Sequence, residues 1–152
     1  MPTEVRFEFF GDAQVDRSLE GLEARGRDLA PAWEQIADRF VEAEKAQFSS
    51  QGEWGSGGWQ PLSPRYAAWK ARHYPGATIL VRTRELLRSL TQGPEVRIIE
   101  PHDMWIGSRV RYGAYHQRGG RHLPRRPPVD LPESERVGWV RVVHEWLIKG
   151  DT

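Results

Sequence analysis

The histidines are the residues of this sequence with the widest chemical repertoire, and four of the five are candidates for metal ligands or acid–base groups: His73, His102, His116 and His122. Zinc ligands usually follow one another at tight helical or hairpin spacing. His116 and His122 lie six residues apart, and no carboxylate occurs between Arg109 and Val129. A metal ion there would face six arginines with no anion to offset them. The pattern predicts no metal site and favours a polar contact of His116 in a turn or interface.

Arrangements for catalysis are also missing from the sequence. It has no cysteine and no Gly-x-Ser-x-Gly elbow to provide a nucleophile. The glycine-rich stretch 52–58 lacks the Gly-Lys-Ser/Thr ending that cradles a phosphate. The carboxylate pairs Glu42/Glu44 and Glu133/Glu135 lie in charge-rich helical segments, where solvated side chains are expected. We therefore expect no enzymatic activity and no cofactor.

A basic stretch with two interleaved tyrosines, Tyr112 and Tyr115, is the most informative chemical feature. Its arginines are Arg109, Arg111, Arg118, Arg121, Arg125 and Arg126. Arginine and aromatic side chains together can follow a nucleic-acid backbone and stack on bases. The sequence predicts no helix for this stretch, and no known nucleic-acid-reading motif accompanies it. Docking on an acidic neighbour, lining a DNA channel and acting as a nucleic-acid-binding module therefore stay open, with docking favoured.

Charge is unevenly distributed along the chain, although the net charge is only +1. Residues 1–50 carry six basic and eleven acidic side chains, a balance of −5, whereas 51–100 and 101–152 each come to +3. Such asymmetry favours head-to-tail contact between copies, or two unlike partners. The solvated faces of a monomer would explain it equally well.

A glycine-rich loop carries two tryptophans. Residues 51–59 include four glycines together with Trp54 and Trp59, which predicts a loop at about 51–60. Tryptophans in a loop can simply cover the core. Tryptophan also dominates the energetics of many interfaces, so the loop equally suits a surface that orders on assembly.

The first half of the chain predicts a strand and a long helix. Val5–Phe9 alternates apolar and polar residues, as in a short strand. From Val15 to Ala43, apolar residues recur every three or four positions, which keeps one face of a helix apolar. The stripe stays in register across Pro31. This predicts either a bent helix or two coaxial pieces, the second beginning at Pro31.

The middle of the chain predicts two shorter helices. Ser63 caps the first, Pro64 takes its first position, and Pro75-Gly76 ends it near Tyr74. The second spans 84–90, with Thr83 as its cap.

The C-terminal part predicts a hairpin, an irregular stretch and a closing helix. The hairpin has strands at 95–100 and 104–111. Residues 113–128 are rich in Arg, Gly and Pro, so an Arg-rich loop is expected at about 111–128. Residues 133–149 fit a helix capped by Ser134 better than a strand, because the helical spacing extends past ten residues.

Together these elements predict an α+β fold, with a long amphipathic helix and shorter helices packed on a small antiparallel sheet. We expect residues 1–152 to form a single domain. No apolar run approaches the roughly 20 residues of a membrane span. The expectation is a soluble protein made in the cytoplasm, with no membrane partner.

Three motifs, in order, resemble the phage virion morphogenesis family, a Mu-like group of tail completion proteins. A Trp-x-Pro-Leu-Ser step at 59–63 precedes a Lys-bearing helix, and an Ile-Leu…Thr…Leu…Ser step follows at 79–89. The most specific motif, Tyr-Ala-x-x-His-Gln-x-Gly, is matched at 112–119 with glycine in place of its alanine. A Pro/Arg-rich turn then precedes the closing helix. The resemblance covers about residues 30–148; Gly113, Arg118 and Arg84 depart from the usual residues.

The resemblance implies a structural protein of tail completion or head–tail joining, with no catalytic residue and no cofactor. Together with the charge asymmetry it implies a homo-oligomeric ring around the DNA path, for which sixfold symmetry is expected. Expected partners are other copies, neighbouring connector and tail proteins and, transiently, packaged DNA. The expected location is the virion, at the head–tail junction or tail terminus. Within the motif, Tyr112, His116 and Gln117 are expected to satisfy backbone groups, and Gly119-Gly120 to allow positive φ.

Overall fold

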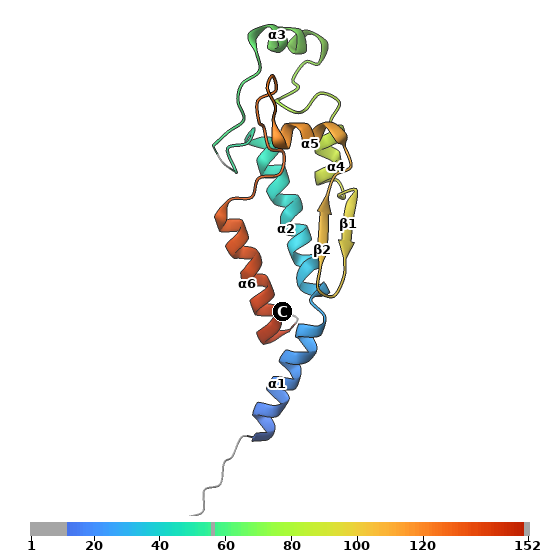
Figure 1. Cartoon of the computed structure of the whole chain (residues 1–152), viewed down its shortest axis with the longest axis vertical. Coiled ribbons are helices and arrows are strands. Elements are labelled where there is room, and N and C mark those ends of the chain that lie inside the picture. Colours follow the sequence, from blue (N-terminus) through green and yellow to red (C-terminus); the bar gives the residue numbers. More distant parts are fainter. Residues whose placement is uncertain (1–11, 56, 151–152) are drawn as a thin grey trace, which may run out of the picture.

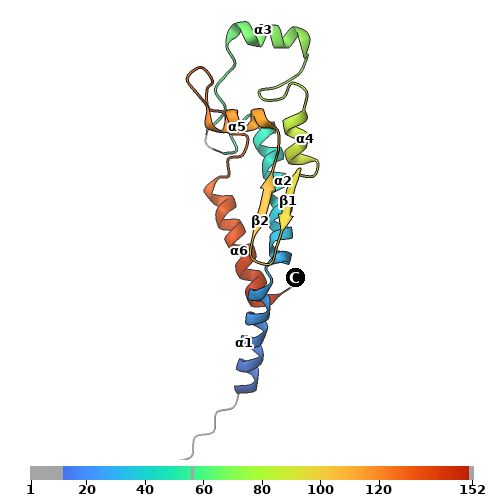
Figure 2. The ribbon, with the colours of Figure 1, turned by 45° about the vertical axis from the view of Figure 1, so that its right-hand side comes forward.

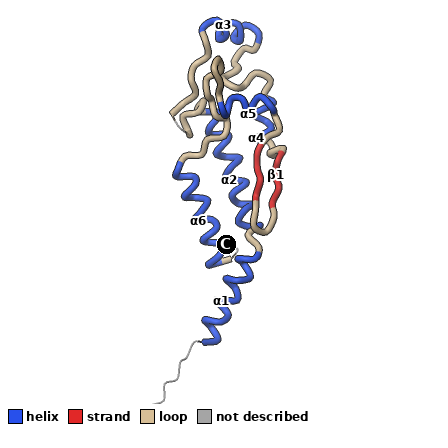
Figure 3. The backbone as a smooth tube through the Cα atoms, viewed as in Figure 1, coloured by secondary structure: helices blue, strands red, loops and turns tan. Residues whose placement is uncertain are grey.

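The computed structural model describes residues 12–55 and 57–150, which form six helices and one two-stranded antiparallel sheet. This confirms the α+β class. The molecule is elongated, with α1 at one end and α3 at the other, and long loops connect the elements at the α3 end (Figures 1 and 3). The strand expected at Val5–Phe9 lies outside the described residues.

The N-terminal helical segment consists of two helices, α1 (Asp12–Arg27) and α2 (Ala30–Ser49), which lie roughly end to end (Figures 1 and 2). The break between them has a tertiary cause, because the Leu29 N–H donates to Pro101 O of the hairpin turn at 2.8 Å. Pro31 stands in the first turn of α2, where its missing N–H costs nothing. Of the two expected arrangements, the structure has the two-piece one.

The core lies along one face of α2. Ile36, Phe40 and Ala43 of the predicted apolar stripe are at most 4% exposed. The same stripe on α1 is open, because Val15 and Leu19 are 58% and 57% exposed. The periodicity therefore predicts the helices, but not which part of the stripe finds a partner.

Helix α6 (Glu133–Lys149) packs beside α2, where Val142 contacts the cluster of Ala32 and Ile36. Trp146 Nε1 donates to Asp28 O at 3.0 Å, and Arg25 Nε of α1 donates to Leu147 O at 2.7 Å. These bonds hold the end of α1 against the end of α6. The helix is confirmed with the predicted bounds, but its predicted cap is wrong: Pro132 takes the cap position, with no side-chain hydrogen bond.

Strands β1 (Val96–Ile99) and β2 (Met104–Gly107) form the hairpin, with Val96 opposite Gly107 and Ile99 opposite Met104. Arg97 joins it to α2 through ion pairs with Glu34 and Asp38.

Both strands are shorter than predicted, and the second stops well before residue 111. Ser108 Oγ lies 2.6 Å from Ser89 Oγ, and the Arg109 N–H donates to Glu95 Oε2 at 2.9 Å. After Gly107, contacts with side chains therefore replace the strand pairing, and β2 ends there.

Helices α3 (Pro64–His73) and α4 (Glu85–Thr91) confirm the two shorter helices of the middle region. Ser63 caps α3 as predicted, its Oγ accepting the Tyr66 N–H at 3.4 Å. Thr83 does not cap α4; the cap position is Arg84, whose φ is +63°. The Tyr112 hydroxyl instead accepts the Leu86 N–H at 3.2 Å, so a distant side chain replaces the local cap.

The predicted Arg-rich loop at 111–128 is wrong in its first half, where α5 (Arg111–Arg118) forms a two-turn helix. Eight residues that include a glycine show too little periodicity to predict a helix. Gly113 is buried, and a Cβ there would lie 2.9 Å from Leu86 Cδ1, so close packing on α4 positions the helix. The helix ends at Gly119, whose φ is +71° as expected, whereas Gly120 does not have a positive φ.

Glu44 on α2 was expected to be solvated, but it is only 1% exposed. Its Oε2 is buried with no hydrogen-bond partner among the described residues. Burial, and then the negative charge of Asp130, raise the pKa of Glu44 to about 8. The carboxyl group is therefore mostly protonated at neutral pH.

The buried carboxyl group predicts a pH-dependent stability. An unfolded glutamate ionises near its ordinary pKa of 4.5, whereas folded Glu44 ionises near 8, so the free energy of unfolding falls as pH rises through this interval. We expect Glu44→Gln to remove this dependence and to stabilise the protein at pH 9 by a few kcal/mol. Urea unfolding at pH 5, 7 and 9 measures it. The exposed Glu42→Gln is the control; equal pH dependence in wild type and Glu44→Gln would contradict the assignment.

The end of α5 predicts a strict need for glycine at one position. At Gly119 (φ +71°, ψ −176°) a Cβ would lie 3.0 Å from the Arg125 backbone, whereas at Gly120 it would meet open space. Gly119→Ala should lower the free energy of unfolding by roughly 1–3 kcal/mol. Gly120→Ala, the matched control, should change it by much less. Thermal unfolding of both variants is the test, and equal melting temperatures would refute this account of the turn.

Candidate functional site

The two tryptophans of the glycine loop have different environments. Trp59 is 6% exposed, packs edge-on against Phe48 at a centroid distance of 5.3 Å, and donates from Nε1 to Pro127 O at 2.9 Å. Trp54 is 39% exposed and borders a shallow hollow with Arg39 and Glu135. Of the two roles left open for these tryptophans, Trp59 has the core position, because its ring is already covered, while Trp54 remains available.

Close contacts hold the glycine loop in shape. Gly52 has φ +91°, and a Cβ there would lie 2.4 Å from the Trp59 ring. The Gly55 N–H donates to Gln47 Oε1 at 2.9 Å, and a Cβ on Gly55 would lie 2.7 Å from Asp130 O. These two glycines let the backbone approach neighbouring groups more closely than any other residue would allow.

Helix α5 has an inner and an outer face. On the inner face, Tyr112 accepts the Leu86 N–H, and Gln117 pairs with both backbone groups of Val129, donating at 2.8 Å and accepting at 3.1 Å. On the outer face, Tyr115 is 63% exposed and lies between Arg111 and Arg118 at helical spacing. The side chains on the inner face therefore hold neighbouring segments of the backbone in place. Those on the outer face expose positive charge and an aromatic ring to solvent.

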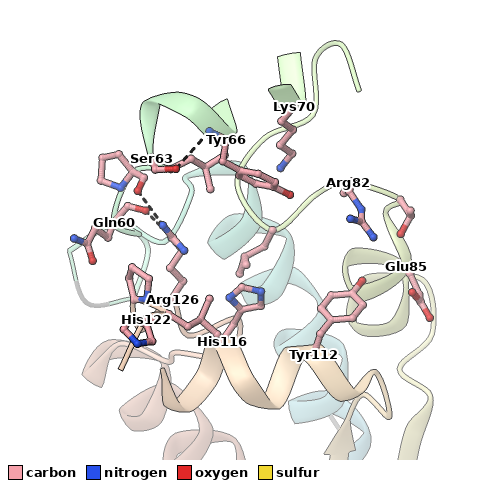
Figure 4. Close-up of a pocket in the computed structure, with 16 residues that line it drawn as sticks. Gln60, Ser63, Tyr66, Lys70, Arg82, Glu85, Tyr112, His116, His122 and Arg126 are labelled. Carbon is pink, nitrogen blue, oxygen red and sulfur yellow. Dashed lines mark hydrogen bonds between the residues drawn. The ribbon is translucent and has the colours of Figure 1, made fainter. Parts of the chain in front are cut away.

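His116 lies on the side of α5 that faces the pocket described below (Figure 4). His116 was expected to satisfy a backbone group, but its Nδ1 is buried with no hydrogen-bond partner among the described residues. Its backbone oxygen accepts the Arg126 N–H at 2.9 Å. Burial, and then the charge of Arg126, lower the pKa of His116, which favours the neutral ring.

The six arginines of the basic stretch do not form one surface. Five are exposed: Arg109, Arg111, Arg118, Arg121 and Arg125. Arg126 is 5% exposed, and its Nε and a terminal nitrogen donate to Gln60 O at 2.6 Å and Pro61 O at 2.9 Å. Arg126 therefore does not share the exposed surface of the other five, because its guanidinium joins the Pro-rich turn to the loop before α3.

A pocket of about 780 Å³ lies between the segment before α3, the chain before α4, and α5 (Figure 4). Its polar lining includes Lys70, Arg82, Glu85, His116, His122 and Arg126. Residues of all three sequence motifs border it, since Pro61, Leu80 and Tyr112 also line the cavity. The motifs, widely separated in the chain, thus converge on one hollow.

Lys70 and Arg82 were not predicted as site residues. Lys70 is 4% exposed and its Nζ donates to Thr78 O. Burial, then the charges of Arg82 and Arg126, lower the pKa of Lys70. In the sequence, the feature that could have identified Lys70 was its place on the helix after the Trp-x-Pro-Leu-Ser step.

Within residues 12–55 and 57–150, no group of three or more His, Cys, Asp or Glu side chains is placed to hold a metal ion. Among the helices of the same residues, none is long and apolar enough to span a membrane.

Comparison with known proteins gives one match. No curated protein and no solved structure shows a significant match to the chain. The model of the phage virion morphogenesis family matches residues 11–142, which is well over half of the chain. The matched span contains α1 to α5 and about half of α6. This protein therefore belongs to the phage virion morphogenesis family.

Proposed function

We propose that the protein is a structural component of tail completion or head–tail joining, and that it works as a homo-oligomeric ring around the DNA path, without catalysis. Membership of the family supports a role in phage virion assembly. The proposed ring and the proposed place in the tail or neck rest on surfaces of the folded chain that remain exposed to solvent.

The observation that carries the proposal is the uncovered apolar face of α1, formed by Val15, Leu19 and Leu22. These side chains recur at helical spacing and are 58%, 57% and 40% exposed. In Figures 1 and 2, α1 extends beyond α6 and the hairpin, so most of its length has no neighbour among residues 12–55 and 57–150. Covering such a stripe removes apolar surface from water, which is the main drive for association. A second copy is the occupant that we propose.

The DNA path is proposed to face the exposed arginines. Arg111, Tyr115 and Arg118 form one outer row on α5, and Arg121 and Arg125 follow in the next turn. Such residues can neutralise phosphates without reading sequence, as a channel lining requires. An acidic surface of a neighbouring virion protein is the other partner that this row suits.

The apolar face yields a test of oligomerisation. We expect wild-type protein to sediment as a closed oligomer, with a hexamer as the expected size, and Leu19→Lys to shift it to smaller species, because a charge cannot be buried in the contact without a partner. Ala24→Lys puts the same charge on the opposite face of α1 and should leave the oligomer intact. Analytical ultracentrifugation over a concentration series reads the result. A wild-type monomer at all concentrations would contradict the ring.

The alternative function is a nucleic-acid-binding module that uses the exposed arginines as a monomer. It predicts that the isolated protein binds duplex DNA with an affinity that falls steeply with salt. Arg111→Gln with Arg118→Gln would weaken such binding, whereas the structural role requires no affinity of the isolated monomer for DNA.

A further inference from the structure

We propose that the pocket between the segment before α3 and helix α5 binds carboxylate side chains of an acidic peptide segment from a partner protein. The proposal deepens the assembly role, since it names the chemistry by which a partner is recognised. The site itself is defined by the geometry of this chain alone (Figure 4).

Positive charge dominates the lining. Lys70, Arg82 and Arg126 come from three separate segments, against one carboxylate, Glu85. Within the part of the chain that the structure describes, no ion pair joins any of these three cations to a carboxylate. Close, unneutralised like charges raise the energy of the folded state, and an anion in the pocket would lower it.

The two buried cations still have donors to offer. Lys70 uses one contact, to Thr78 O, of the three N–H bonds that an ammonium group carries. Arg126 uses its Nε and one terminal nitrogen on Gln60 O and Pro61 O, which leaves the other terminal nitrogen. The carbonyl contacts hold both side chains in place. Preorganised cations of this kind lose little entropy when a carboxylate arrives.

The shape of the pocket favours a peptide over DNA. Apolar side chains of Leu62, Leu80 and Leu123 line it beside the cations. Lys70 and Arg126 are 4% and 5% exposed, so a ligand must enter the hollow to meet them. A glutamate or aspartate on a flexible segment can do so, with neighbouring apolar groups against the walls. The phosphates of a rigid duplex stay on its outer surface and suit the exposed row on α5 instead.

Peptide binding to the purified, full-length protein tests the proposal. The probe is acetylated hexaglutamate amide, followed by isothermal titration calorimetry, with hexaglutamine of the same length as the neutral control. We expect saturable binding of hexaglutamate that weakens with salt, and none of hexaglutamine. A thymidylate hexamer provides phosphates in place of carboxylates, and we expect it to bind more weakly.

Variants locate the binding. Arg82 is exposed, so Arg82→Gln removes a pocket charge with little risk to folding; it should weaken hexaglutamate binding by about tenfold. Arg65→Gln removes an exposed arginine of α3 outside the lining and should leave binding unchanged. Lys70→Met should weaken hexaglutamate binding more than Arg82→Gln does, and a native circular dichroism spectrum of this variant is the control for folding.

Three results would overturn the proposal: no hexaglutamate binding, equal weakening by Arg65→Gln and Arg82→Gln, or tighter binding of the thymidylate hexamer. The last would assign the pocket to nucleic acid. Peptide binding is measured without reference to the oligomeric state. The peptide-binding proposal can therefore fail even if the ring is found, and the ring can be absent even if the peptide binds.

Discussion

The backbone oxygen of Pro127 is a buried acceptor at which three separate segments near the α3 end of the molecule meet. It receives the indole N–H of Trp59 at 2.9 Å and the amide of Gln47 at 3.1 Å, so it joins the glycine loop and α2 to the Pro-rich turn. The neighbouring Arg126 extends this junction to Gln60 O and Pro61 O. Buried polar groups are expensive unless they are paired, so these bonds specify one arrangement of several long loops.

The two ends of the molecule consequently differ in how complete they are. At the α3 end, the junction positions Arg126 at the pocket, where Lys70 and His116 also lie. At the other end, among the described residues, α1 is held near its last turn by Arg25 and Trp146, and Val15 and Leu19 of its apolar face are exposed. A subunit with a preformed hollow at one end and an uncovered helix at the other suits assembly with partners, in agreement with the family to which the chain belongs.

Much of the secondary structure could be predicted because it follows from local patterns. The three- and four-residue spacing predicts the helices around Phe40 and Val142, and Ser63 with Pro64 marks the start of α3. Helix α5 could not be predicted, since its position depends on the contact of Gly113 with Leu86. The cap of α4 failed for a similar reason, because Tyr112, a residue distant in sequence, takes over the role assigned to Thr83. The cap of α6 failed because the helix begins one residue earlier, with Pro132 at the cap position.

By itself, the sequence determined the fold class, most elements, the absence of recognisable catalytic motifs and the family resemblance, because composition, periodicity and motif order are local properties of the chain. Only the tertiary structure decided the burial of individual side chains. It placed Trp59, Arg126 and Glu44 in the interior and left Val15 and Leu19 uncovered. Burial depends on which segments meet in space, so similar residue types received opposite environments, and the cationic pocket arose from segments that are far apart in the chain.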